Sequence, residues 1–183
     1  MRWQLPMPTS MMHMTKRTSE SGFLPEAASA SGPTREFLHG RALAMQARRE
    51  HSCQEIRRKL LDLGGEPAQV DTILSELVGR RLQSDERFAE IYVRSRAERG
   101  YGPRVIEAEL RGKGLSPELQ AAALVRSGYD WTEQAGLVRQ RRFGRALPAE
   151  PRERARQMRF LQYRGFSGAQ ISQVMRYELP VED

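Results

Sequence analysis

The feature that most constrains how this chain folds is an internal repeat with a period of about 50 residues. Gly64 and Pro67 recur as Gly114 and Pro117 at an offset of 50, with apolar residues in the same register on either side. A third copy, around Gly165, follows at a further offset of 51. Each copy reads as a helix that stops at a glycine, a short turn, and a second helix with an apolar stripe. The pattern indicates a tandem array of like helical units.

A second register of the repeat is also visible, because Arg99-Gly100-Tyr101 resembles Arg164-Gly165-Phe166 at an offset of 65. The first register is preferred, since it keeps the glycine stops, the capping residues and the apolar stripes in phase. With a further helix before each copy, it predicts an all-α fold of three tandem three-helix repeats, at residues 35–82, 83–128 and 129–183. A three-helix unit buries little apolar surface alone. We therefore expect the units to stack into an elongated, curved array.

Capping signals mark the helix ends. Three pairs of residues read as capping boxes, in which each side chain satisfies a backbone N–H of the other: Ser52 with Glu55, Asp130 with Glu133, and Ser167 with Gln170. Prolines stand at expected first helical positions, and glycines at expected ends. Together with the apolar spacing these signals predict nine helices, at residues 35–50, 52–63, 67–80, 85–99, 103–113, 117–127, 130–145, 151–164 and 168–178.

Residues 1–34 differ from the rest of the chain. They are rich in proline, serine and threonine and show no sustained helical period, so we predict a disordered N-terminal tail. Five methionines between Met1 and Met14 leave the start codon open.

Basic residues predict an acidic partner. The chain has 30 basic and 23 acidic residues, a net charge of +7. Residues 139–164 hold nine arginines and two acids, and a weaker basic cluster lies at residues 94–104. Arginine suits phosphate and carboxylate alike, and the interleaved aromatics could stack on bases, so these segments could bind nucleic acid or an acidic protein groove. A merely solvated basic face is the alternative. The candidate contact residues are Arg94, Arg96, Arg99, Arg104, Arg139, Arg141, Arg142, Arg156, Arg159 and Arg164.

The usual enzyme signatures are missing: there is no GxxxxGK[ST] phosphate loop, no HExxH and no GxSxG. The single cysteine, Cys53, can form neither an intrachain disulfide nor a cysteine-based zinc site. His51-Ser52-Cys53 could suggest a nucleophile, but a helix junction in which Ser52 is the cap is the simpler interpretation. We therefore predict a protein that is not an enzyme and that needs no cofactor and no metal.

Nothing in the sequence predicts a membrane span, since no apolar run reaches the roughly 18 residues that such a helix needs. No secretion signal is visible either. We expect a cytoplasmic protein, and a monomer.

Four segments resemble signature regions of the bacterial RecX family. They are Arg48–Ser52 (RREHS), Asp85–Ala89 (DERFA), Tyr92–Pro103 (YVRSRAERGYGP) and Arg154–Ser167 (RARQMRFLQYRGFS). Their order and spacing extend the resemblance over residues 40–178. The long N-terminal tail departs from the compact family pattern.

The resemblance implies a modulator of the RecA recombinase, built from three three-helix repeats. Such a protein would bind along the groove of the RecA–DNA filament and inhibit the recombinase, ATPase and coprotease activities of RecA in DNA repair, recombination and the SOS response. Two other functions stay open on the residues alone. One is a stand-alone helical module that binds single-stranded or double-stranded DNA, and the other is a helical scaffold for a different protein assembly.

Overall fold

The computed structural model describes residues 32–176, and every regular element within that range is an α-helix. The predicted all-α fold class is therefore confirmed. The described part contains nine helices: α1 (Arg35–Arg48), α2 (Cys53–Asp62), α3 (Pro67–Gly79), α4 (Asp85–Glu98), α5 (Pro103–Gly112), α6 (Pro117–Arg126), α7 (Trp131–Phe143), α8 (Pro151–Tyr163) and α9 (Gly168–Val174).

Most helix starts follow the predicted caps. Ser52 and Ser167 form complete capping boxes with Glu55 and Gln170. Asp130 accepts hydrogen bonds from the backbone N–H groups of residues 132 and 133, but its cap lacks the return bond of the predicted box. Proline is the first residue of α3, α5, α6 and α8, where a missing N–H leaves no bond unmade.

Some helix ends differ from the prediction. Helix α1 stops at Arg48 instead of residue 50, because Arg49 is fully extended with φ −166° and ψ 162°. Helix α7 stops at Phe143, since Gly144 leaves the helix with φ 87° and ψ 174°, a conformation open almost only to glycine. Helix α9 ends at Val174, before the predicted residue 178. The end of that prediction, and the predicted tail up to residue 31, lie outside the described residues.

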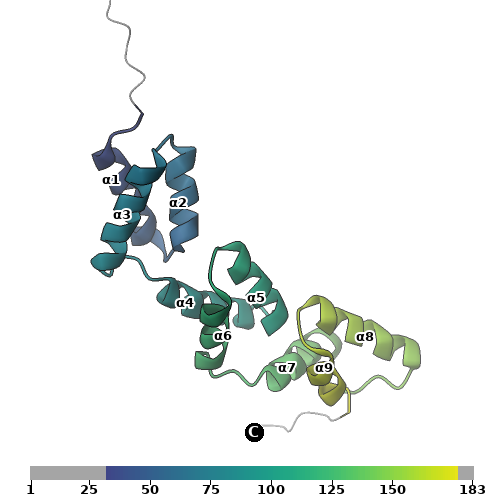
Figure 1. The fold of residues 1–183 in the computed structure, drawn as a ribbon. Helices are drawn as coiled ribbons and strands as arrows, with labels where there is room; N and C mark the ends of the chain where they lie inside the picture. Colours follow the sequence, from purple (N-terminus) through teal and green to yellow (C-terminus); the bar gives the residue numbers. More distant parts are fainter. Residues whose placement is uncertain (1–31, 177–183) are drawn as a thin grey trace, which may run out of the picture. The chain divides into compact units, whose positions relative to one another are not determined.

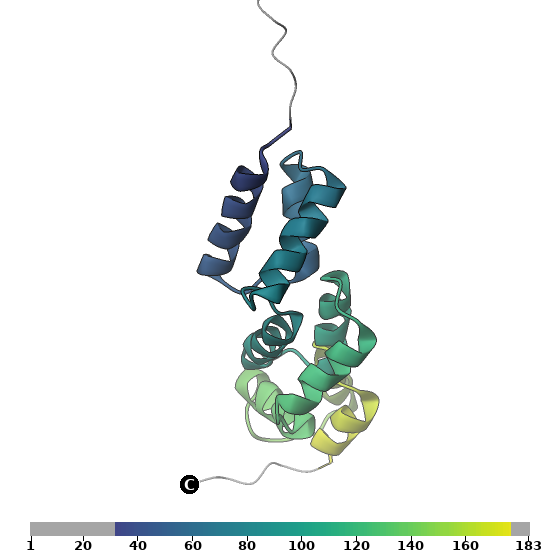
Figure 2. The same cartoon turned by 60° about the vertical axis from the view of Figure 1, so that its left-hand side comes forward.

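The helices form three groups of three, each around its own apolar cluster (Figures 1 and 2). We call α1–α3 module 1, α4–α6 module 2 and α7–α9 module 3. Leu38, Ile56 and Ile73 are fully buried in the first cluster, and Ile106 and Leu161 are fully buried in the second and third. These residues come from the apolar stripes that indicated the helices. The residue bounds predicted for the repeats stay predictions.

Trp131, the first residue of α7, packs against the apolar clusters of both module 2 and module 3. Modules 2 and 3 therefore share apolar contacts. Among residues 32–176 no helix is both long and apolar enough to cross a lipid bilayer.

Candidate partner-binding surface

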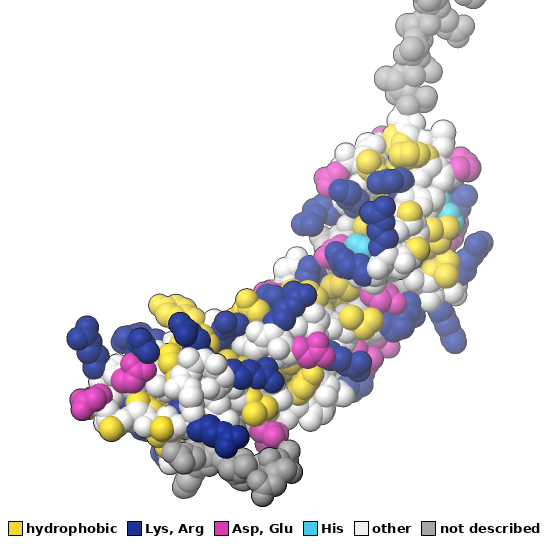
Figure 3. Space-filling model, turned by 180° about the vertical axis from the view of Figure 1, so that it is seen from behind, with side chains coloured by type: hydrophobic (Ala, Val, Ile, Leu, Met, Phe, Trp, Pro, Cys, Tyr) yellow, Lys and Arg dark blue, Asp and Glu magenta, His cyan; other side chains and the backbone are white. Residues whose placement is uncertain are grey.

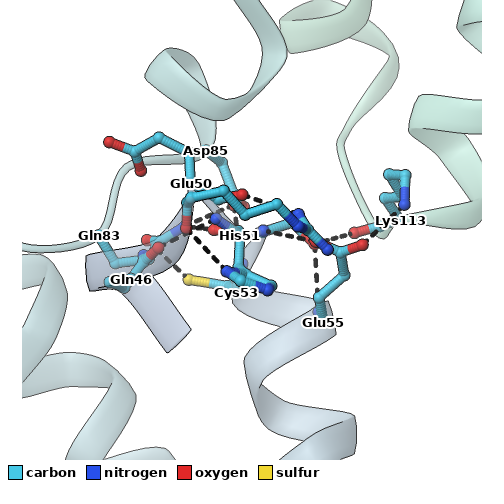
Figure 4. A network of polar contacts seen from close by, with 10 residues as sticks. Gln46, Glu50, His51, Cys53, Glu55, Gln83, Asp85 and Lys113 are labelled. Atoms are coloured by element: carbon cyan, nitrogen blue, oxygen red, sulfur yellow. Dashed lines mark hydrogen bonds and ion pairs between the residues drawn. The ribbon is translucent and has the colours of Figure 1, made fainter. Parts of the chain in front are cut away.

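Modules 1 and 2 meet at a polar junction in which the α5–α6 turn lies against the start of α2 (Figure 4). The buried Ser52 hydroxyl donates a hydrogen bond of 2.8 Å to the backbone oxygen of Lys113. The Lys113 ammonium lies 2.7 Å from Glu55 Oε1, and the Arg49 guanidinium lies 3.3 Å from Glu55 Oε2. Glu55 is thus held between two cations, one from each module.

The environment of Glu55 favours its charged form. Burial of the carboxyl raises its pKa, but hydrogen bonds and charges from Lys113 and Arg49 outweigh burial, so the pKa lies below the ordinary value. The Glu55 side chain is only 12% exposed. Glu55 therefore supplies a negative charge that offsets part of the positive charge of this junction.

The His51-Ser52-Cys53 segment is the helix cap that the simpler interpretation predicted. Ser52 is the N-cap of α2. The Cys53 backbone N–H donates to Asp85, and its thiol donates to Gln83. Burial and the nearby Asp85 charge raise the pKa of the Cys53 thiol to about 11, so the thiolate that a nucleophile requires is disfavoured.

Modules 2 and 3 meet at a second junction, which is formed by the equivalent segments of the repeat. The Gly102 N–H donates to the backbone oxygen of Arg164 at 2.7 Å, and the Arg104 N–H donates to that of Gly165 at 3.1 Å. Gly102 corresponds to Ser52 at the repeat offset of 50, and Arg164 to Lys113 at the offset of 51. The repeat found in the sequence is thus also a repeat of the contact between modules.

The second junction is closely packed because glycines face each other. A Cβ atom on Gly102 would lie 2.7 Å from backbone atoms of Gly165 and Phe166, and a Cβ on Gly165 would lie 2.6 Å from the Val105 nitrogen. Real Cβ atoms essentially never come within 3.0 Å of such neighbours. The two segments that resembled each other at an offset of 65 are therefore direct contact partners.

Most of the predicted contact arginines lie at the surface. The exposed ones are Arg94, Arg99, Arg104, Arg141, Arg142, Arg156 and Arg159. Arg96 and Arg164 are half-buried. Arg96 forms an ion pair with Glu109, and its guanidinium carbon lies 4.1 Å from the centre of the Tyr101 ring. The guanidinium is therefore already engaged by residues of module 2.

Arg139 does not belong to the exposed surface. Its side chain is 1% exposed and donates to the backbone oxygens of Arg145 at 2.5 Å and Ala146 at 3.1 Å, and to Gln157 Oε1 at 3.3 Å. The prediction that it contacts a partner disagrees with this position. A long charged side chain can be buried when its donors meet backbone oxygens, and these oxygens belong to the α7–α8 loop.

Four of the predicted arginines line one hollow of about 220 Å³ beside the second junction. Arg99 follows the last residue of α4 in module 2, while Arg141, Arg142 and Arg164 come from module 3. The Arg164 guanidinium carbon lies 5.1 Å from the centre of the Tyr101 ring and 5.3 Å from that of Phe160. We call this site the junction hollow. Glu98 is the one acid along its lining.

The remaining predicted arginines lie elsewhere. Arg156 and Arg159 join Arg152 around a hollow of about 540 Å³ at the start of α8, where two glutamates offset part of the charge. Arg94 and Arg104 line neither hollow. The ten residues therefore do not form one site.

The sequence predictions missed a basic cleft of about 430 Å³ in module 1, between α1 and α2. Arg41, Arg48, Arg58 and Lys59 line it, and among the described residues none of the four pairs with a carboxylate. Figure 3 shows Lys and Arg side chains gathered on this module as well as on module 3. Arg58 and Lys59 belong to a short basic run at residues 57–59, but the predicted contact residues lie only in the basic segments at residues 94–104 and 139–164.

Comparison with known proteins identifies the family. A profile of the second three-helix domain of RecX matches residues 84–124, and one of the third three-helix domain matches residues 128–175. The regulatory protein RecX of Halorhodospira halophila is 43% identical over 143 residues, which cover 78% of this chain and 89% of that protein. RecX of Pseudomonas fluorescens is 42% identical over 134 residues, covering 73% and 86%.

Solved structures agree on the fold. The crystal structure of RecX from Lactobacillus salivarius superimposes with a TM-score of 0.68 at 22% identity, over 78% of this chain and 94% of that one. A second RecX crystal structure gives a TM-score of 0.66 at 24% identity, over 78% and 73%. At these identities the solved structures show a shared fold alone. The two sequence relatives show more, because they match this chain at 42–43% identity over most of its length and most of their own. On these matches, the chain belongs to the RecX family of regulatory proteins.

Proposed function

We propose that this protein is a cytoplasmic regulator that binds the RecA–DNA filament and inhibits the recombinase, ATPase and coprotease activities of RecA. The observation that carries the proposal is the junction hollow, where four arginines of two successive modules converge and Glu98 is the one acid in the lining. Repeating modules suit a repeating partner, because each module can contact an equivalent surface on a neighbouring protomer. By bridging protomers, the protein would oppose filament growth or the movements that accompany ATP turnover.

Co-sedimentation with RecA filaments on single-stranded DNA tests this function, with the same DNA lacking RecA as the control. The wild-type protein should sediment with the filaments and reduce their ATPase rate. A triple charge reversal of Arg141, Arg142 and Arg156, all exposed, should weaken both effects while leaving helicity intact. Reversal of Arg80, Arg111 and Arg176 is the matched control, since these arginines are also exposed and change the net charge equally. Equal inhibition by the two triple variants would contradict the proposed surface.

A stand-alone nucleic-acid-binding module is the second candidate, and the basic cleft of module 1 favours it. Arg41 and Arg48 are two helical turns apart, about 10 Å along α1, so together they can reach separate phosphates of one strand but not one small anion. This function predicts salt-dependent binding to bare DNA that RecA does not increase. Substitution of Arg41 and Arg58 by glutamine should then reduce the slope of log affinity against log salt by about 1.4 for single strands. An unchanged slope would argue against DNA in the cleft.

A further inference from the structure

The two junctions between modules differ at the position of Glu55, the carboxylate that lies between a cation of module 1 and a cation of module 2. At the first junction, Glu55 bridges Arg49 and Lys113. The repeat offsets relate Arg49 to Arg99 and Lys113 to Arg164, so both cations are retained at the second junction. The residue that corresponds to Glu55 is Val105, which cannot pair with either.

The cations of the second junction take other partners. Arg164 Nη1 donates to the backbone oxygen of Arg99 at 3.1 Å, and its guanidinium lies over the Tyr101 and Phe160 rings. Among the described residues no carboxylate forms an ion pair with Arg99 or Arg164. Glu98 lines the hollow without pairing to either. The positive charge that Glu55 neutralises at the first junction is left uncompensated at the second.

We propose that the junction hollow receives an aspartate or glutamate side chain of a protein partner, whose carboxylate replaces the one that Glu55 supplies at the first junction. Glu55 shows which ligand suits this pair of cations, because it is a carboxylate held by the equivalent residues of the same chain. Arginine adds a planar fork that matches a carboxylate. The inference rests on the proposed function only for the identity of the partner.

The size and lining of the hollow favour a protein side chain over a nucleic-acid backbone. Its volume of about 220 Å³ accommodates one side chain, whereas the 430 Å³ cleft of module 1 extends along two helices. Val138, Gly100 and Phe160 supply an apolar floor for the methylene groups that carry the carboxylate. A phosphodiester strand offers no such apolar arm.

Val105→Glu tests the proposal, because it would supply the missing carboxylate from within the chain. The installed carboxylate should pair with Arg99 and Arg164 and exclude the partner, so capture by RecA filaments should weaken at least tenfold. Val105→Gln is the matched control, since it has the same size without the charge, and it should retain affinity within about threefold. Circular dichroism and thermal unfolding of both variants check that each is folded.

Arg99→Gln combined with Arg141→Gln tests the same site without altering the packing at Val105. Both arginines are exposed, and their loss should weaken capture about as much as Val105→Glu does. The proposal is overturned if Val105→Glu and Val105→Gln bind equally well, or if the double variant binds like the wild type. It is also overturned if Val105→Glu lowers affinity for bare single-stranded DNA by the same factor, because the ligand would then be phosphate.

A short poly-glutamate peptide, followed by fluorescence anisotropy, separates this proposal from the proposed function. If the wild type binds the peptide and Val105→Glu does not, while RecA filaments capture neither protein, the acidic-side-chain site stands and the RecA function fails. If filaments capture both proteins equally, the RecA function stands and the assignment of the hollow fails.

Discussion

Replacement of Gly102 by alanine should loosen the contact between modules 2 and 3. Gly102 has φ −90° and ψ 171°, which alanine adopts without strain, so the effect comes from the new methyl group alone. That group would lie 2.7 Å from the carbonyl carbon and oxygen of Gly165, where ordinary contacts are 3.4–4 Å. Both neighbours are backbone atoms, which cannot rotate away as a side chain can. The turn at Gly102 and the turn at Gly165 must therefore move apart.

This separation of the two turns breaks two hydrogen bonds that join the modules. They run from Gly102 N–H to Arg164 O at 2.7 Å and from Arg104 N–H to Gly165 O at 3.1 Å. A hydrogen bond of this kind contributes about 0.5–1.5 kcal/mol net, so their loss should lower the free energy of unfolding by about 1–3 kcal/mol. Gly112→Ala is the control, because a Cβ there meets nothing within 4 Å and the position lies in a helix. It should be neutral or stabilising by up to about 1 kcal/mol.

Urea unfolding followed by circular dichroism measures both variants, and hydrogen exchange locates the change. In Gly102→Ala, the amides of residues 102 and 104 should lose protection, while those inside α2 and α3 should keep theirs. A Gly102→Ala protein as stable and as protected as Gly112→Ala would refute the close approach of the two turns.

Two further substitutions probe buried polar groups. Arg139→Met should lower the free energy of unfolding by about 2–3 kcal/mol, because the charge-assisted hydrogen bonds to the oxygens of Arg145 and Ala146 are lost. Hydrogen exchange across residues 144–150 should also accelerate. Arg139→Lys, which keeps the charge but not the fork, should fall between wild type and Arg139→Met, and unchanged exchange in the loop would contradict this role. Glu55→Gln should reduce stability at neutral pH, where the carboxylate is ionised and paired. Since the folded-state pKa of Glu55 lies below its ordinary value of 4.5, its contribution is present above that value and is lost as the pH falls through the lowered pKa. Unfolding curves of wild type and Glu55→Gln between about pH 7 and pH 3 should therefore converge toward the acid end, and a constant gap would show that the charge plays no part.

The sequence predicted the helices well because their determinants are local. A cap such as Ser52 and a stop such as Gly114 act within one turn of the helix, and both are visible in any window of a few residues. The apolar stripes gave buried residues such as Ile56 and Leu161 for the same reason. At the end of α1 the prediction was two residues too long, because the extended backbone of Arg49 ends the helix without a glycine or proline.

The candidate site was harder to predict, because pairing between distant charges depends on the fold. Arg139 and Arg141 belong to the same basic run, yet one is buried and the other is exposed. Their difference arises from the α7–α8 loop, whose oxygens come within reach of Arg139 only after the chain has folded. Likewise, Glu55 and Lys113 are 58 residues apart, so no local pattern showed that a carboxylate pairs with the cations of the first junction.

Among the described residues, the long α7–α8 connection of module 3 and the contact of Pro33 with the Gly64 turn in module 1 have no counterpart in the other modules. In modules 1 and 2, the connection between the first two helices packs against a turn of the next module, as Ser52 does with Lys113. Within residues 32–176 no module follows module 3, and its corresponding connection, residues 144–150, is longer and is held by its own Arg139. In module 1 the turn at Gly64 corresponds to the turn at Gly114, and within residues 32–176 it meets Pro33, whose Cδ lies 3.4 Å from the Cβ position of Gly64. In the described part of the chain, side chains of the same module therefore lie where a neighbouring module lies at the two junctions. Arg139 is therefore buried against the loop of its own module, while Arg99 and Arg164, with which no described carboxylate pairs, lie where modules 2 and 3 meet.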